Sequence, residues 1–385
     1  MANHHKSLLL KLSLFAAILQ YALPAHAQHA KGHELNFLAI ANSITAGNKT
    51  DTGTVKNNIT YPPLSTAPVA RAKNIFSDEA LPSINAEATI SKPQERKQLM
   101  GYLKTITSDD EVVYNQSRTK FLYKLGNVFT KLRLYPLAMK CYLKTTKVKP
   151  GEIIDTLQPP SNINYLAINS TDDSLLNQQA ILATAPGFDK KKSPVTSYKY
   201  ITSMLDDGKK AVAYAMLFHV KQPVPGKRKI FVGGNTGHTF ITLIKYNVDS
   251  TYSSFSFGFY PKKRNPLSAT PLVPAASSVF KDDTDHNWDE VAGKFISKKR
   301  FEKILLLTKQ YDNLEYHLSN NNCTDFGLKA AQLAGININD TTGKWPLGHG
   351  NNPAITGQSM LEGKVANADT GKAEGVFVNN TVVVP

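Results

Sequence analysis

Residues 320–326 read Asn320-Asn321-Asn322-Cys323-Thr324-Asp325-Phe326 and stand directly before an apolar pattern. Asn322 is a preferred N-cap residue, and the carboxylate of Asp325 can reach back to an unpaired N–H group of the first turn. Gly335 suits the left-handed position at which many helices end. The inner face of this segment consists of Phe326, Ala330 and Leu333. The sequence therefore predicts a helix over residues 323–334, with Cys323 in its first turn.

Cys323 has the surroundings of a nucleophile in this helix. The unpaired N–H groups and the positive end of the helix dipole favour a thiolate over a thiol. The same N–H groups can stabilise an oxyanion, so we assign this role to the helix start around Asn322 and Thr324. An unreactive structural thiol is one alternative for Cys323. A disulfide with Cys141, the only other cysteine, is another.

A thiolate nucleophile also needs a partner that exchanges protons, and His238 is the best candidate. This histidine follows the glycine-rich loop 233–237 and begins an apolar strand. A polar ring at the mouth of a buried strand is more often functional than structural. His219 and His317 are rival candidates, and a role for His349 stays open.

The segment around these residues has the pattern of an α+β domain. Apolar strands are predicted over 211–220, 239–246, 252–260 and 290–296. Helices are predicted over 198–205 and 298–309, and the helix bearing Cys323 follows them. The fold class we expect is an antiparallel sheet with a cysteine-bearing helix, preceded by a small α-helical region.

The order of these motifs resembles that of the circularly permuted papain-like thiol hydrolases, a superfamily that includes NlpC-type peptidases and the lecithin retinol acyltransferase group. The resemblance covers about residues 210 to 336. It rests on Gly237-His238-Thr239-Phe240-Ile241, on Phe257-Gly258-Phe259-Tyr260-Pro261 and on Tyr316-His317-Leu318 before Asn322-Cys323-Thr324. In the permuted members the histidine strand precedes the cysteine helix. The resemblance implies a papain-like sheet, Cys323 as the nucleophile and His238 as the base.

The same resemblance implies a third polar residue that orients the histidine, on the strand after the histidine strand. Residues 256–260 contain no His, Asp, Asn or Gln at that place. If the turn centres near Asp249, Tyr260 returns level with His238. We therefore name Tyr260 as the orienting residue, with a backbone carbonyl as the alternative.

A helical region is predicted upstream, over residues 93–152. The window 119–152 matches one tetratricopeptide repeat, which places Cys141 on a buried helix face as an inert thiol. An ordinary helical hairpin is the alternative. The matching positions are Leu122, Leu125, Gly126, Phe129, Ala138, Tyr142 and Pro150.

The N-terminus has the features of a secretory signal peptide. A basic start, an apolar run over 8–23 and the small residues Ala25 and Ala27 predict cleavage before Gln28. A membrane anchor is the alternative, and no later stretch is apolar enough to span a bilayer. We expect export to the periplasm or the extracellular space. The predicted parts are a signal peptide (1–27), an irregular leader (28–92), the helical region (93–152), a linker (153–195), the papain-like domain (196–345) and a C-terminal extension (346–385).

The chain carries a formal net charge of +15. This excess would suit anionic partners such as cell-wall polymers, but a solvated lysine surface is the preferred explanation. We find no nucleic-acid motif. The histidines outside the signal peptide show no metal-ligand spacing, so we expect neither metal nor cofactor.

These features together predict an exported cysteine hydrolase, a peptidase or amidase that cleaves amide or ester bonds through an acyl-enzyme on Cys323. Its substrate would be a peptide or acyl compound, with cell-wall peptides as the first choice. An inactive papain-like binding module and a thiol acyltransferase are the alternatives. A protein partner is possible through the helical region, and we expect no stable membrane span after cleavage.

Overall fold

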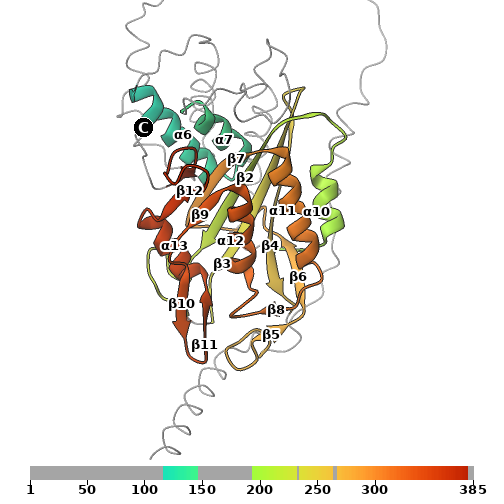
Figure 1. Cartoon of the computed structure of the whole chain (residues 1–385), viewed down its shortest axis with the longest axis vertical. Coiled ribbons are helices and arrows are strands. Elements are labelled where there is room, and N and C mark those ends of the chain that lie inside the picture. The colour runs from blue at the N-terminus through green and yellow to red at the C-terminus, as the bar shows by residue number, and fades with distance from the viewer. Residues whose placement is uncertain (1–115, 146–192, 232–233, 263–266, 380–385) are drawn as a thin grey trace, which may run out of the picture. The chain divides into compact units, whose positions relative to one another are not determined.

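A computed structural model describes residues 116–145, 193–231, 234–262 and 267–379. Its central element is a seven-stranded sheet in which every neighbouring pair of strands is antiparallel (Figure 1). The strands follow the order β1 (Val195–Thr196), β6 (Ser278–Asp282), β4 (Tyr252–Pro261), β3 (His238–Asn247), β2 (Ala211–Lys221), β7 (Glu290–Ile296) and β13 (Phe377–Val378). The expected α+β class with an antiparallel sheet is confirmed.

The four long strands begin and end within one residue of the predicted bounds. Strand β3 is buried along its whole length, although polar residues such as Thr242 and Lys245 interrupt its apolar sequence. Alternate residues of a strand point to opposite faces of the sheet. On β2, Met216 and Phe218 therefore belong to one apolar cluster, and Ala215 and Leu217 belong to another on the opposite face.

Three helices cover the face that carries Met216: α10 (Tyr198–Leu205), α11 (Lys298–Tyr311) and α12 (Cys323–Ala334). Helix α12 lies especially close to strands β2 and β3. A Cβ atom at Gly327 would come within 2.7 Å of the Thr239 methyl group and 2.8 Å of the Phe218 ring. Glycine at this position lets the helix approach the sheet, and this brings Cys323 next to the start of β3.

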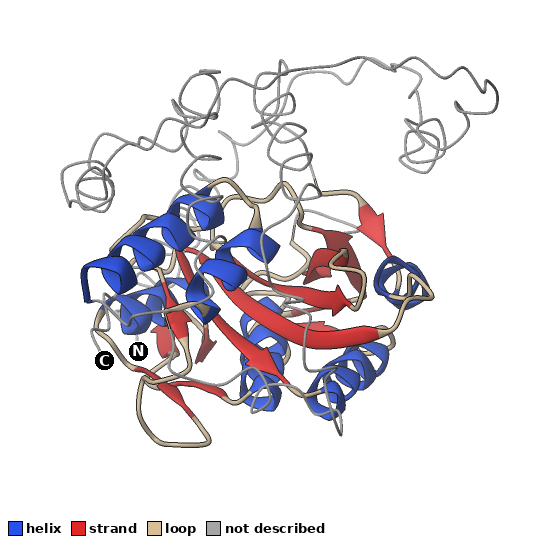
Figure 2. Ribbon diagram, turned by 90° about the horizontal axis from the view of Figure 1, so that it is seen from above, coloured by secondary structure: helices blue, strands red, loops and turns tan. Residues whose placement is uncertain are grey.

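The opposite face is covered by the helical hairpin α6 (Gln116–Lys131) and α7 (Tyr135–Leu143), so that helices lie on both sides of the sheet (Figure 2). The hairpin is close-packed, because a Cβ atom at Gly126 would lie 3.3 Å from the Ala138 carbonyl oxygen. The Tyr246 hydroxyl donates to the Pro136 carbonyl at 2.9 Å. The hairpin itself was expected, whereas its membership of the tetratricopeptide family stays a prediction.

The C-terminal segment is part of the domain. Strand β13 pairs with β7 and forms one edge of the sheet. The hairpin of β10 (Thr342–Trp345) and β11 (Gly348–Asn351) contains the expected domain boundary at residue 345. Three further elements complete the segment: β9 (Ile336–Ile338), α13 (Pro353–Leu361) and β12 (Val365–Asn367). The short strands β5 (Ala275–Ala276) and β8 (Tyr316–His317) form a separate pair.

Several expectations fall outside the described residues. They concern the signal peptide 1–27, the leader 28–92, the helix before residue 116 and most of the linker 153–195. Within the described ranges, no helix is long and apolar enough to cross a membrane. The disulfide alternative fails, because the structure leaves Cys141 and Cys323 as two separate buried thiols.

Candidate active site

The predicted capping arrangement holds Cys323 at the start of α12. The Asn322 side chain accepts hydrogen bonds from the backbone N–H groups of Thr324 at 2.7 Å and Asp325 at 3.1 Å. In return, the Asp325 carboxylate accepts the backbone N–H of Asn322 at 2.9 Å. Gly335 ends the helix with a φ of 81°. The expected N-cap, capping box and left-handed exit are all confirmed.

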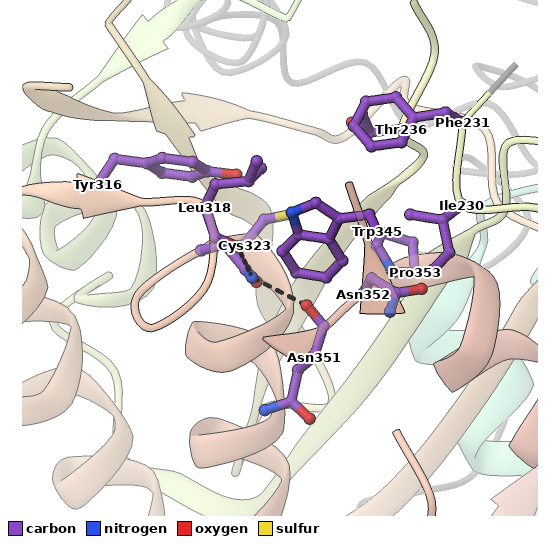
Figure 3. Close-up of a pocket in the computed structure, with 11 residues that line it drawn as sticks. Ile230, Phe231, Thr236, Tyr316, Leu318, Cys323, Trp345, Asn351, Asn352 and Pro353 are labelled. Atoms are coloured by element: carbon purple, nitrogen blue, oxygen red, sulfur yellow. Dashed lines mark hydrogen bonds between the residues drawn. The ribbon is translucent and has the colours of Figure 1, made fainter. Parts of the chain in front are cut away.

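This cap leaves one backbone donor near the nucleophile. The Thr324 N–H is used by Asn322, and so it is not open to a ligand. The Cys323 N–H donates a hydrogen bond to the hydroxyl of Tyr316, a buried residue of β8 whose ring points towards the cysteine (Figure 3). An oxyanion at the helix start would therefore have to replace the Tyr316 hydroxyl as the acceptor of the Cys323 N–H. The Thr324 hydroxyl lies 4.0 Å from the sulfur.

His238 has a buried carboxylate partner, Asp283. The ring Nε2 atom lies 2.9 Å from Asp283 Oδ2. The other carboxylate oxygen accepts hydrogen bonds from the Tyr260 hydroxyl at 2.6 Å and the Ser193 hydroxyl at 2.7 Å. Because Nε2 is occupied, Nδ1 is the ring nitrogen left for the Cys323 thiol.

The expected role of Tyr260 is therefore corrected. Its ring packs against the imidazole of His238 with centroids 4.2 Å apart, so it does return level with the histidine. Its hydroxyl, however, binds Asp283 rather than His238. Asp283 orients the histidine, and Tyr260 holds Asp283.

Asp283 escaped sequence reasoning because of the strand order. The resemblance to the papain-like hydrolases places the third residue on β4, which follows β3 along the chain. The carboxylate comes from the residue after β6, which lies beside β4 in the sheet. The run Asp283-Thr284-Asp285-His286, directly after β6, was the available signal.

The electrostatics of the buried site favour an ion pair between Cys323 and His238. Burial alone lowers the pKa of His238, but the Asp283 carboxylate and the neighbouring thiol outweigh it and raise this pKa to about 9. Burial raises the pKa of the Cys323 thiol, and the imidazole of His238, with the Thr239 N–H, lowers it to a net value below the ordinary one. Thiolate and imidazolium therefore stabilise each other.

Gly258 on β4 makes room for the histidine–aspartate pair. A Cβ atom at this position would lie 2.5 Å from His238 Nε2 and would also overlap Asp283 Oδ2. Glycine is therefore the residue over which the two side chains can meet. This close approach gives the Phe257-Gly258-Phe259 motif a physical reason.

Gly258→Ala is expected to displace His238 from Asp283 and to slow alkylation of Cys323 by iodoacetamide about tenfold or more at pH 6, because less thiolate is present. The alkylation rate and the melting temperature are measured together. Ser254→Ala is the control, because it lies on the same strand, opposite Ile244 and away from His238. An unchanged rate in a folded Gly258→Ala protein contradicts this role.

The rival histidines lie away from the thiol. His219 is fully buried behind Phe240, which stacks on it with centroids 4.4 Å apart. Burial lowers the pKa of His219 to about 3. His317 accepts a hydrogen bond from the Ser319 N–H at 3.2 Å, and His349 is exposed on β11. His286, which sequence reasoning missed, lies beside His238 with ring centroids 5.0 Å apart.

A small recess of about 30 Å³, partly open to solvent, lies beside Cys323. Its walls are mostly apolar and include Ile230, Leu318, Trp345 and Pro353 (Figure 3). The indole Nε1 atom of Trp345 is buried and has no hydrogen-bond partner among the described residues. A buried donor without an acceptor costs roughly 1–3 kcal/mol, so this N–H is a candidate contact for a polar atom of a ligand.

The β10–β11 hairpin that carries Trp345 is tied to the start of the cysteine helix. The Asn351 side chain donates to Asp325 Oδ1 at 2.7 Å. The Asn322 side chain donates to the Asn351 carbonyl oxygen at 2.9 Å. The recess and the nucleophile are thus fixed to one another by the capping residues themselves. The sequence did not predict this use of the C-terminal segment.

Comparison of the chain with protein-family models, with curated protein sequences and with solved structures found no match. Among the residues that the structure describes, no group of three or more His, Cys, Asp or Glu side chains is arranged to hold a metal ion.

Proposed function

We propose that this protein is a cysteine hydrolase that cleaves an amide or ester bond through an acyl-enzyme on Cys323. The observation that carries the proposal is the buried hydrogen bond between His238 and Asp283 beside a thiol at a helix start. Nucleophile, base and orienting carboxylate are the three parts that acyl transfer by a thiol requires. The motif order that resembles the permuted papain-like hydrolases supports the same assignment.

The proposed reaction begins with the thiolate of Cys323. Its sulfur forms a bond to the carbonyl carbon, and the carbonyl electron pair moves to the oxygen. The tetrahedral intermediate then expels the leaving group, which takes the proton held by His238 at Nδ1. A water molecule attacks the resulting thioester and gives a proton to His238, and the acid leaves as the thiolate is restored.

Two donors are suited to stabilise the oxyanion in this reaction. The first is the backbone N–H of Cys323, for which an oxyanion would replace the Tyr316 hydroxyl as acceptor. The buried indole N–H of Trp345 lines the same recess without an acceptor. Fixed donors in a recess shielded from water are the largest single source of catalysis in many acyl-transfer enzymes.

The function is tested with p-nitrophenyl acetate, a small activated ester. The full chain is expected to release p-nitrophenol and to carry an acetyl group on Cys323, identified by mass spectrometry. Cys323→Ser should lose the acetyl adduct, whereas Cys141→Ser, the matched control at the other buried thiol, should retain it. A folded wild-type protein that neither reacts with the ester nor with iodoacetamide contradicts the proposal.

Trp345→Phe is expected to slow acetylation of Cys323 by about 10²-fold, the usual cost of losing one oxyanion donor. Alkylation by iodoacetamide should change little, because displacement at its CH₂ carbon creates no oxyanion. The ratio of the two rates is therefore the measurement. Trp288→Phe, the same change at the other tryptophan of the chain, is the control. An equal loss in both reactions would point to a packing defect instead.

The site geometry bears differently on the two alternative functions that the sequence left open. The inactive-module hypothesis rests on the lack of a third polar residue on β4 and on the single tetratricopeptide-like unit, and Asp283 answers the first of these two points. A thiol acyltransferase would use the same first steps and pass the acyl group to an amine or hydroxyl instead of water. We keep export, cell-wall peptides as substrate and a partner on the helical region as parts of the proposal.

A further inference from the structure

Large apolar side chains are exposed around the mouth of the recess. Leu347, at the tip of the β10–β11 hairpin, is 78% exposed, and Leu272 is 52% exposed. Val273 and Phe231 are also exposed. We call these four residues the apolar rim. Single exposed leucines are ordinary on a protein surface, whereas a group around a binding site is not.

Contacts between the segments place the apolar rim around one opening. The Leu318 N–H donates to the Pro274 carbonyl at 2.9 Å, next to Val273. A Cβ atom at Gly348, next to Leu347, would lie 3.1 Å from the Ser319 hydroxyl. Strands β5, β8, β10 and β11 accordingly lie at the same end of the domain (Figure 1). Phe231 lines the recess itself.

Leu347 occupies a backbone position that favours glycine. Pro346 and Leu347 form the two-residue loop between the paired Trp345 and Gly348, and Leu347 has a φ of 66°. Proline followed by a residue with positive φ is the pattern of a type II turn, in which glycine or asparagine is usual. A leucine there is unfavourable for the backbone and exposes its whole side chain, so stability of the isolated domain does not explain it.

Exposed basic residues accompany the apolar rim. Lys227 and Lys229 precede Ile230 of the recess, and Lys344 lies next to Trp345. Arg228 is paired with Glu362 at 2.6 Å. Glu315, before β8, is the exposed acid close to β5 and β8 among the described residues. The apolar rim can insert between the lipids of a bilayer, and the lysines beside it can bind anionic headgroups at the membrane surface.

We propose that the apolar rim docks on an anionic lipid bilayer, with the Leu347 side chain inserted and the mouth of the recess facing the membrane surface. Burial of exposed apolar area supplies one part of the binding, and attraction of the lysines to anionic lipids supplies the other. The proposal does not depend on catalysis by Cys323.

The two tryptophans of the chain allow a local test. In Trp288→Phe the remaining indole is Trp345, two residues from Leu347, and in Trp345→Phe it is Trp288. Phosphatidylglycerol vesicles that contain brominated acyl chains quench only tryptophans that reach the bilayer. We expect quenching of Trp345 and none of Trp288. Attachment through another part of the chain, such as the apolar run 8–23, would quench neither, and this result overturns the proposal.

Leu347→Asn is expected to weaken vesicle binding about tenfold, equivalent to ~1.4 kcal/mol, without loss of melting temperature, because asparagine tolerates positive φ. The control is Leu306→Gln on α11, where a leucine of similar exposure, 55%, lies outside the apolar rim. Equal binding by both variants, or binding to a protein but not to vesicles, contradicts the membrane assignment. Cys323→Ser should bind as the wild type does, which separates this proposal from the catalytic one.

Discussion

His238→Ala is expected to slow alkylation of Cys323 by iodoacetamide between tenfold and about 300-fold at pH 6, because an ordinary thiol with a pKa near 8.5 is only about 1 part in 300 thiolate at that pH. The imidazole is the main group that lowers the pKa of this buried thiol. Without it, burial in apolar surroundings favours the neutral thiol. The tenfold limit applies if the thiolate of the variant, which is more basic, also reacts faster and offsets part of its lower abundance.

The matched control is His349→Ala, which removes an exposed histidine from the hairpin that lines the same recess. Its alkylation rate should equal that of the wild type. Melting temperatures of both variants establish that the fold is retained. If His238→Ala reacts as fast as the wild type, the helix start alone stabilises the thiolate, and His238 is not its partner.

Asp283→Asn is expected to lower turnover of p-nitrophenyl acetate by about 10²-fold or more, because a neutral amide holds the imidazolium less well and can favour the wrong tautomer. The carboxylate is the largest influence that raises the pKa of His238 against the effect of burial. The basic limb of the pH–rate profile, expected near 9 in the wild type, should therefore move to lower pH in the variant.

This shift distinguishes an orienting carboxylate from a purely structural one. Loss of packing would lower the amount of folded enzyme without moving the pH limb. Asp283→Ala should be worse than Asp283→Asn, since it also removes the acceptor of the Tyr260 and Ser193 hydroxyls. Breaking a buried charged pair of this kind typically costs about 3–5 kcal/mol of stability. An unmoved basic limb in Asp283→Asn contradicts the role of Asp283.

Sequence reasoning predicted the parts of the site that depend on local sequence patterns. The cap at Asn322, the exit at Gly335 and the strand start at His238 depend on neighbours a few residues away. The helix α12 follows from these end signals and its apolar face, and the long strands follow from their apolar residues. Their positions in the structure match the predictions closely.

The missing parts depend on contacts between distant segments. Asp283 reaches His238 only because β6 pairs with β4, and no local pattern states which strands are neighbours in a sheet. Trp345 reaches the recess through hydrogen bonds between Asn351 and the helix cap. Tyr260 shows both sides of this limit. The β3–β4 hairpin predicted that Tyr260 lies level with His238. It did not predict that the Tyr260 hydroxyl binds Asp283.

The central claim is that Cys323 is a thiolate at neutral pH, paired with the imidazolium of His238. The most direct measurement is the rate of iodoacetamide alkylation at Cys323 as a function of pH, with the site identified by mass spectrometry. The pKa of His238 is raised to about 9 and that of Cys323 is lowered, so the ion pair exists between the two values. Because the pKa of Cys323 is lowered, we expect the rate to stay high to a lower pH than for an ordinary cysteine, whose thiolate fraction falls below about pH 8.5. A rate that falls tenfold for each pH unit below about 8.5, as for an ordinary cysteine, would contradict it.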